Sequence, residues 1–214
     1  MRPLALLLFT ALLCSATPAR ADGDDAGDGL YGRLDTDLRL SVAAGAGARS
    51  PGTAPDVAPI GLVELRARYL DSAGVFVASD SDDGRWRVSG GVELRPLFLA
   101  RFLLDRESGR SYLDLLVDSF GLELGVAATH LTTLPTAALV LGVGLDVPLV
   151  IDPFRLAFRV GFRWTYAGGD GRPDVTGAPR GEETDVVVLG ALVVDVGVNT
   201  GLAARQGPRA RRVP

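Results

Sequence analysis

Histidine and cysteine, which perform much of the acid–base and metal chemistry of proteins, are almost absent from this 214-residue chain. His130, in the stretch ATHLTT, is the only histidine, and Cys14 is the only cysteine. No carboxylate adjoins His130 to orient it as a general base. A single histidine and a single cysteine also fall short of the ligand clusters that transition metals need. We therefore expect no catalytic residue, no metal site and no cofactor, and we interpret His130 as a loop residue.

Three short motifs partly match ligand-binding loops. GVGLDV (142–147) has two glycines of a dinucleotide-binding loop but lacks the third glycine and a following helix. DGDDAGDG (22–29) and DSDDG (80–84) are acidic, but neither completes the twelve-residue calcium-binding pattern. We interpret the first motif as a strand with a face of small residues and the other two as solvated acidic segments.

Arginine provides every positive side chain of the chain, because lysine is absent, and its spacing is informative. In FRLAFRVGFRWTYAG (154–168), Arg155, Arg159 and Arg163 recur among apolar, aromatic and small residues. On a helix, Phe158 and Phe162 would lie beside the arginines. On a strand, the arginines share one face with small residues, and the other face is entirely apolar or aromatic. The spacing therefore predicts a strand with one apolar and one charged face.

The same alternation recurs along the chain, with turn-forming residues between the runs. It is found in residues 33–48, 62–70, 85–96, 120–129 and 136–149, whereas 185–199 is apolar on both faces. Strands that follow one another without helices between them indicate an antiparallel all-β protein. Residues 111–120 fit either a helix, through the spacing of Leu113, Leu116 and Phe120, or the continuation of a long hairpin.

Alternation alone leaves open which face is inside. A soluble barrel buries its apolar face, whereas a membrane barrel turns that face to lipid and keeps the charged face in its interior. Three features favour the membrane barrel: the charged face is rich in glycine and alanine, it carries both signs of charge, and aromatic residues gather near the ends of the runs. We therefore predict an antiparallel up-and-down transmembrane β-barrel.

Two sets of residues follow from this prediction. Arginines and acids on the inner faces should pair through forked hydrogen bonds, and aromatic residues should form girdles at the membrane interfaces. The charge network comprises Arg33, Asp35, Asp37, Arg39, Glu64, Arg66, Arg68, Arg85, Arg87, Glu93, Arg95, Glu123, Asp146, Arg155, Arg159 and Arg163. The aromatic girdle comprises Tyr69, Trp86, Phe98, Phe154, Trp164 and Tyr166. Because arginine predominates in the network, we expect a net positive interior.

Counting back from the last run predicts eight strands, with both ends of the barrel domain on the periplasmic side. They are residues 33–48, 59–70, 74–79, 85–98, 120–129, 136–149, 154–167 and 185–199. An even number is what bacterial membrane barrels have, and eight strands leave an interior that side chains fill. The run 74–79 is short: if 59–79 is one long strand, the count becomes seven and the hairpin at 101–118 must supply another strand. Ten strands is the alternative count.

The two ends of the chain differ in composition from the barrel. Residues 1–21 have the features of a secretory signal peptide: Arg2, an apolar run at 4–13 and the small-x-small sequence Ala19-Arg20-Ala21. We divide the rest into an acidic linker (22–32), the barrel (33–202) and a basic tail (203–214). Without the signal peptide, 20 arginines face 26 acids, and a chain of net charge −6 is a poor nucleic-acid binder.

In these respects the chain resembles the small outer-membrane β-barrels of Gram-negative bacteria, the OmpA-type and Opa-like barrels, over about residues 30–202. The last strand of that family ends in a pattern of polar, glycine, hydrophobic and aromatic residues. Asp195, Gly197, Thr200 and Leu202 fall at those spacings, with Thr200 and Leu202 departing from the residue types. The resemblance implies a monomer of the outer membrane that contacts outer-membrane lipid, and the barrel-assembly machinery during insertion. It also implies a structural or surface-interaction role without catalysis.

Two alternatives stay open at this point. An exported soluble barrel of the lipocalin type would use the apolar face to bind an apolar ligand. An outer-membrane lipid-modifying enzyme is the other, because lipid A deacylases are similar in size and use a His-x-Ser pair. Here the pair would be His130 and Thr132, and threonine departs from that pattern.

Overall fold

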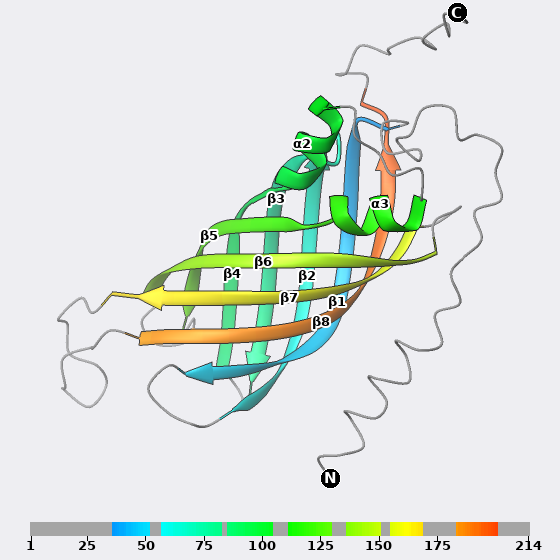
Figure 1. Ribbon diagram of the computed structural model, residues 1–214. Coiled ribbons are helices and arrows are strands. Elements are labelled where there is room, and N and C mark those ends of the chain that lie inside the picture. Colours follow the sequence, from blue (N-terminus) through cyan, green and yellow to red (C-terminus); the bar gives the residue numbers. More distant parts are fainter. Residues whose placement is uncertain are drawn as a thin grey trace, which may run out of the picture.

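The computed structural model describes residues 36–51, 57–82, 85–104, 111–129, 136–150, 155–168 and 183–200, which form eight strands and two helices (Figure 1). The strands are β1 (Leu38–Pro51), β2 (Ala58–Tyr69), β3 (Ala73–Asp82), β4 (Arg85–Leu94), β5 (Gly121–Thr129), β6 (Thr136–Val150), β7 (Arg155–Ala167) and β8 (Glu183–Val198). The helices α2 (Pro96–Leu104) and α3 (Ser111–Asp118) lie between β4 and β5.

Several predicted features lie outside the described residues. These are the signal peptide, the acidic linker and the basic tail, together with Arg33, Asp35, His130, Thr132, Phe154, Leu202 and the side chain of Arg85.

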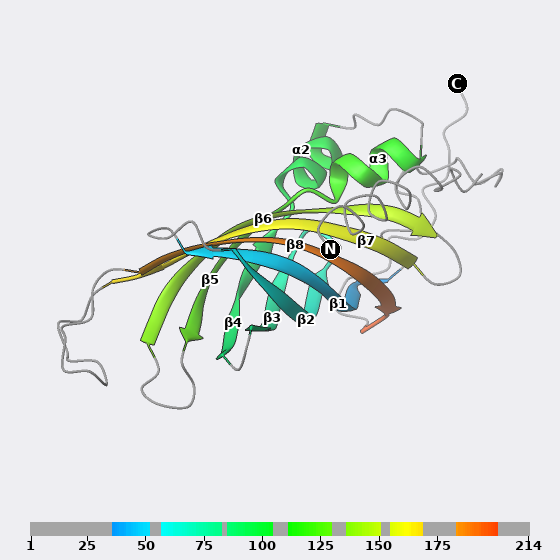
Figure 2. The ribbon, with the colours of Figure 1, turned by 90° about the horizontal axis from the view of Figure 1, so that it is seen from below.

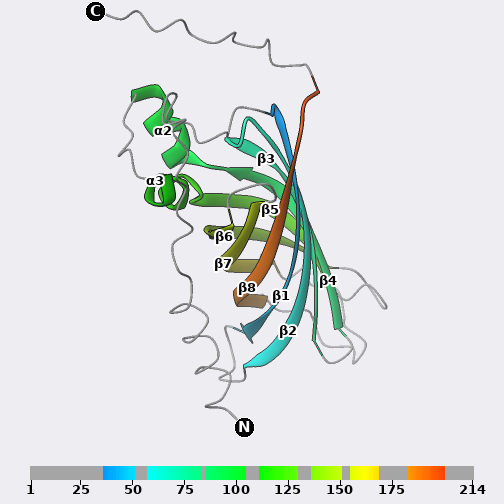
Figure 3. The same cartoon turned by 90° about the vertical axis from the view of Figure 1, so that its right-hand side faces the viewer.

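Each strand pairs antiparallel with the next, and β8 pairs with β1 to close the barrel (Figures 2 and 3). Following hydrogen-bonded partners once around the barrel from Leu40 leads back to Ser50, a stagger of ten residues. A closed sheet with such a stagger has strands tilted by roughly 35–45° from the barrel axis. The predicted all-β, eight-stranded antiparallel barrel is confirmed, with eight strands rather than ten.

The segment between β4 and β5 is helical, which decides the alternative that the sequence left open for residues 111–120. Arg101 on α2 holds α3 in place, because its guanidinium donates hydrogen bonds to Asp114 and, at 2.9 Å, to Asp118. Ser119 then fastens α3 to β6: its hydroxyl donates to the Asp146 carbonyl at 2.9 Å and accepts the Asp146 amide at 3.0 Å. Neither described helix is long and apolar enough to cross a membrane.

The predicted strand 85–98 is wrong at its end. β4 stops at Leu94, and Phe98 belongs to α2, where it is only 4% exposed and stacks on Phe102. Pro96 explains the change, because proline cannot donate to a sheet ladder but is favoured in the first turn of a helix. Phe98 is therefore not part of an aromatic girdle.

The prediction of a solvated acidic segment at 80–84 is also wrong in its first part. β3 is ten residues long and continues through Asp82, so the length of the strand predicted at 74–79 was underestimated. Asp80 is buried, and both Asp80 and Asp82 are bonded by Arg49 of β1. The composition Ser-Asp-Ser-Asp is typical of turns, but here the acids face inward and the serines outward.

Glycines on the inner faces make room for neighbouring strands and side chains. Gly91 of β4 and Gly125 of β5 lie opposite each other, and a Cβ on Gly91 would collide with the Leu124 carbonyl oxygen. Farther along the sheet, a Cβ on Gly144 would lie 3.0 Å from Nε and Nη2 of Arg159. Gly144 therefore leaves space for the long side chain of Arg159.

We predict that Gly144→Val destabilises the barrel by about 1–3 kcal/mol, because the new side chain must displace the Arg159 guanidinium. Gly61→Val is the matched control, since Gly61 is exposed and the nearest atom to an added Cβ is the Ser81 hydroxyl at 4.0 Å. Urea unfolding of the purified proteins in detergent measures both changes. Equal midpoints for the two variants would contradict this account of Gly144.

Candidate functional site in the barrel interior

Charged side chains occupy most of the barrel interior in three groups along its axis. We call the end of the barrel that carries α2 and α3 the helix end, and the opposite end the loop end (Figure 1). The central network consists of Glu64, Arg66, Glu93, Glu123, Arg159 and Arg163. It contains three arginines and three glutamates, so its charges balance.

Arg66 is the hub of the central network. Its Nη1 donates to Glu93 at 2.7 Å, its Nη2 donates to Glu123 at 2.6 Å, and its Nε donates to Glu64. The three carboxylates come from β2, β4 and β5, so one guanidinium joins three strands. All four side chains are at most 2% exposed. Ion pairs removed from water in this way hold only when every charge is matched and hydrogen-bonded.

The arginines of β7 complete the network from the other side of the barrel. Arg163 donates to Glu123 at 2.7 Å through Nε and to Glu64 through Nη2. Arg159 donates to Glu93 at 3.1 Å and to Glu64 at 3.4 Å. Each glutamate therefore has at least two arginine partners, and β7 is tied to three strands that do not neighbour it in the sheet.

An apolar patch adjoins the central network. Phe76 of β3 is 1% exposed and lies against the guanidinium groups of Arg66 and Arg163, at 5.3 Å and 5.2 Å from its ring centre. Such cation–π contacts let a ring share the interior with charges. The patch itself comprises Ala43, Ile60, Leu62, Phe76, Ala78, Ala157, Val187, Leu189, Ala191 and Val193. It explains why 185–199 is apolar on both faces: one face of β8 fills the interior.

At the loop end, two arginines bind acids of the segment 80–84, which the sequence analysis interpreted as a solvated acidic segment. Arg49 donates to Asp80 and, at 2.6 Å, to Asp82. Arg87 donates to Asp80 at 2.9 Å and to the Thr165 hydroxyl at 3.1 Å. These contacts join β1, β3, β4 and β7 around the loop end.

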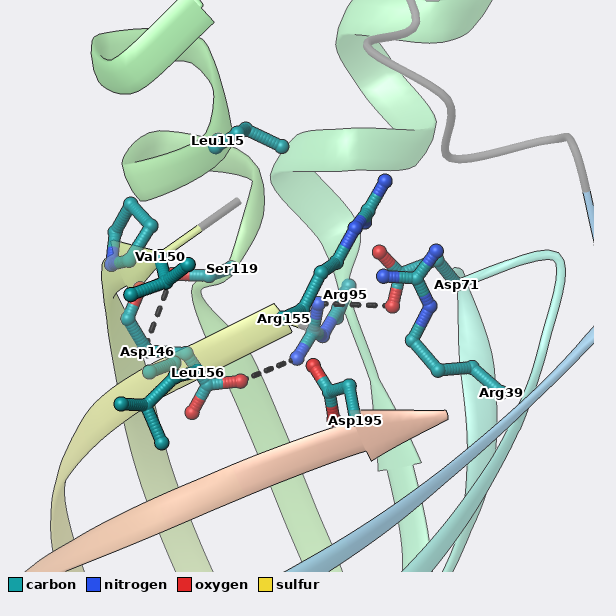
Figure 4. A pocket seen from close by; sticks show the side chains of 12 residues that line it. Arg39, Asp71, Arg95, Leu115, Ser119, Asp146, Val150, Arg155, Leu156 and Asp195 are labelled. Atoms are coloured by element: carbon teal, nitrogen blue, oxygen red, sulfur yellow. Dashed lines mark hydrogen bonds and ion pairs between the residues drawn. The ribbon is translucent and has the colours of Figure 1, made fainter. Parts of the chain in front are cut away.

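At the helix end, Arg68 and Arg95 hold three aspartates, and Figure 4 shows Arg95 between Asp71 and Asp146. Arg95 donates to Asp71 at 3.0 Å and to Asp146 at 2.6 Å. Arg68 donates to Asp195 at 3.0 Å and to Asp146 at 3.4 Å. Asp71 lies in the turn between β2 and β3 with a φ of 53°, a left-handed conformation that aspartate tolerates better than most residues.

Arg95 follows the last residue of β4, and its environment keeps it charged. Burial by itself lowers the pKa of Arg95, but the carboxylates of Asp71, Asp146 and Glu93 outweigh it and raise the pKa above its ordinary value. The group is therefore a fixed positive charge and not a proton carrier.

The structure brings together most of the predicted charge network. Ion pairs in the interior involve Glu64, Arg66, Arg68, Arg87, Glu93, Arg95, Glu123, Asp146, Arg159 and Arg163. Asp37 is buried and accepts the Thr200 amide at 2.6 Å, while Arg39 and Arg155 line a cavity at the helix end.

The prediction missed Arg49 and four acids that pair with interior arginines. The acids are Asp71, Asp80, Asp82 and Asp185. Asp80 and Asp82 were predicted to lie in a solvated acidic segment, although they continue the period-two alternation of Phe76 and Ala78. Among the described residues these acids balance the interior arginines, so the expected net positive charge is wrong for that part of the interior.

Among the predicted girdle residues, Trp164 and Tyr166 stack at 5.8 Å near the loop end of β7. Trp86, 56% exposed, lies at the same end on β4, and Tyr69 is exposed at the helix end of β2. Three of these residues therefore lie near the loop end and one lies at the helix end, and their role as a girdle stays a prediction.

Comparisons with known proteins assign no function. No family model matches the chain, and no curated protein matches it. Among solved structures, it is similar to the crystal structure of Neisserial surface protein A, with 12% identity and a TM-score of 0.39 over 76% of this chain and 98% of that chain. At this level of similarity the comparison supports no functional argument. The interpretation rests on the physical features of the barrel. In the described part of the chain, no group of histidine, cysteine, aspartate or glutamate is arranged to hold a metal ion.

We predict that Arg66→Met costs about 3–5 kcal/mol of unfolding free energy, because it leaves three buried glutamates without their common partner. Arg66→Lys is the matched control: it keeps the charge but loses the fork, so its cost should be smaller. Denaturant unfolding in detergent, followed by tryptophan fluorescence, measures both. If Arg66→Met were as stable as the parent protein, the central network would not hold the strands together.

Proposed function

We propose that this protein is a small, non-catalytic outer-membrane β-barrel whose interior is closed by paired charges, with a structural or surface-interaction role. The observation that carries the proposal is the inverted distribution of polarity, because the inner faces of the strands hold charges and the outer faces hold aliphatic side chains. Soluble proteins have the opposite arrangement, since water solvates charge and disfavours apolar surface.

The outer surface is apolar on every strand. One exposed residue from each strand, in order, is Leu40, Leu65, Val77, Val92, Leu124, Leu141, Phe162 and Val194, all 40–55% exposed. Soluble monomers rarely expose continuous apolar patches of more than a few hundred Å². An apolar belt that surrounds the barrel is suited to contact with the hydrocarbon core of a bilayer.

The dimensions of the strands also suit a bilayer. The shortest strand, β5, has 9 residues and the longest, β8, has 16. A tilted transmembrane strand needs about 9–11 residues. Trp86, Trp164 and Tyr166 near one end of the belt and Tyr69 near the other have the positions of interfacial anchors.

Closure of the sheet supports a monomer that is stable in lipid. β8 pairs with β1 along fourteen positions, from Leu38↔Val198 to Pro51↔Asp185, so the sheet closes into a barrel. Inside hydrocarbon an open edge would leave backbone groups without partners, which closed barrels avoid. The signal peptide predicted at residues 1–21 is consistent with export to the outer membrane.

The soluble, ligand-carrying alternative is less well supported. A lipocalin-like barrel needs an apolar interior with room for its ligand, and ligand pockets typically have about 300–1,000 Å³. Here ion pairs cross the middle of the barrel, and the cavity at its helix end has a volume of about 40 Å³. No described feature favours the enzyme alternative, which depends on His130 and Thr132.

We predict that Val160→Arg lowers folding stability in lipid vesicles by about 2–4 kcal/mol, the cost of arginine near the bilayer midplane. Val160 lies near the middle of β7, faces outward and is 38% exposed. Val160→Leu is the matched control and should fold as the parent does. If Val160→Arg folded equally well in vesicles and gained solubility without detergent, the outer face would be facing water.

We also predict that the purified barrel gives no large, steady conductance in a planar bilayer. The central network and the apolar patch fill the middle of the interior, so ions have no open path through it. Because arginines and acids balance in the central network, brief openings should show weak charge selectivity. A porin-like conductance in single-channel recordings would contradict the closed interior.

A further inference from the structure

A small cavity at the helix end differs from the rest of the described interior in having a buried arginine, Arg39, that bonds no carboxylate. Its volume is about 40 Å³, and Figure 4 shows the side chains that line it. α3 forms part of its wall, because β5 begins only at Gly121, opposite Gly144, and leaves the last residues of β6 without a strand on that side. Leu115 and Ser119 occupy this gap. The charged residues that line the cavity are Arg39, Asp71, Arg95, Asp146, Arg155 and Asp195.

The three aspartates of the cavity already have partners. Arg95 bonds Asp71 and Asp146, and Arg68 bonds Asp195. Each of these carboxylates therefore accepts a hydrogen bond from Arg68 of β2 or from Arg95, which follows β4.

Arg39 has no such partner. It is 6% exposed, its Nε is buried without a hydrogen-bond acceptor, and among the described residues its guanidinium makes no hydrogen bond or ion pair. Its direct neighbour across the β1–β2 ladder is Arg68, another cation. Like charges opposite each other in a sheet are unfavourable, and a buried unpaired charge is more so. The other wholly buried arginines whose side chains are described, Arg49, Arg66, Arg68, Arg87, Arg95, Arg159 and Arg163, each contact a carboxylate.

We propose that this cavity binds a small oxyanion of the phosphate class, with Arg39 as its principal donor. A guanidinium presents a planar fork of N–H groups that matches two oxygens of a phosphate. The cavity has room for the anionic group alone, so a larger ligand would have to extend out of the barrel. Two sources share this chemistry: free inorganic phosphate, and the phosphate of a phospholipid. The second source rests on the proposed membrane location, whereas the first does not.

The test uses the full mature chain in dodecyl maltoside, a detergent without phosphate. Isothermal titration with sodium phosphate, against sodium chloride at equal ionic strength, should show saturable binding of phosphate alone. Arg39→Gln should weaken that binding by about tenfold or more, the expected effect of losing a charge-assisted hydrogen bond. Arg49→Gln removes a buried arginine at the loop end and should leave phosphate affinity within about twofold.

Competition identifies the source of the phosphate. Phosphatidic acid in mixed micelles should displace inorganic phosphate if a lipid headgroup enters the cavity, and diacylglycerol, which differs only by the phosphate, should not. Displacement assigns the site to lipid, and its absence assigns the site to free phosphate. Binding of neither phosphate nor phosphatidic acid by the parent protein would overturn the proposal.

Thermal unfolding without phosphate provides a second readout that does not depend on finding the ligand. If Arg39 is an unpaired buried cation, Arg39→Gln should keep or raise the melting temperature, whereas Arg49→Gln should lower it. A clear fall for Arg39→Gln would show that Arg39 has a partner within the protein, and the anion site would be wrong. Both measurements are made in micelles and do not depend on a bilayer. A Val160→Arg result that contradicts the membrane location would therefore leave them unaffected.

Discussion

Pairing of arginine with carboxylate inside the barrel is the interaction on which the rest of the structure depends. Once the apolar faces of eight strands turn outward, their charged faces enter a space only wide enough for side chains. There the charges have little water and must satisfy each other. Arg66 shows the result most clearly, since it bonds glutamates from three strands. The glycines at 142 and 144 follow from the same constraint, because Glu123, Arg159 and Arg163 pass directly over them.

These ion pairs also fix the register of the sheet. A slip of one residue in any strand would turn its charged face to the outside and its apolar face inward. The contacts between Arg163 and Glu64 and between Arg159 and Glu93 cross from β7 to β2 and β4, so they constrain strands that share no ladder. Buried ion pairs are weak evidence for net stability, because desolvation offsets much of their attraction. In this barrel we infer that their main contribution is to select one strand alignment.

The sequence was sufficient for the features that depend on local periodicity. Alternation placed the charges on one face of each strand, predicted eight strands, and located most of the interior network. It failed where composition and tertiary contacts disagree: Asp80 and Asp82 look like turn residues until Arg49, 31 and 33 residues away, is seen to bind them. Residues 111–118 satisfied two periodicities, and the contacts of Arg101 and Ser119 favour the helix. Partners far apart in the sequence, such as Glu64 and Arg163, which are 99 residues apart, follow from the stagger of the closed sheet, which alternation does not encode.

The same constraint gives meaning to the exception at Arg39. In a barrel whose strands are aligned by matched charges, an unmatched cation opposite Arg68 is unfavourable for folding, and glutamine or serine at that position would avoid the cost. Its position is also particular, because it lies at the end where β5 is short and α3 replaces the missing wall. Folding does not need the charge of Arg39, and the cavity beside it is formed by α3 as well as by the strands. This arrangement is expected of a binding residue rather than of a structural one. The central network therefore accounts for the assembly of the barrel, and the helix end is where a ligand would act on it.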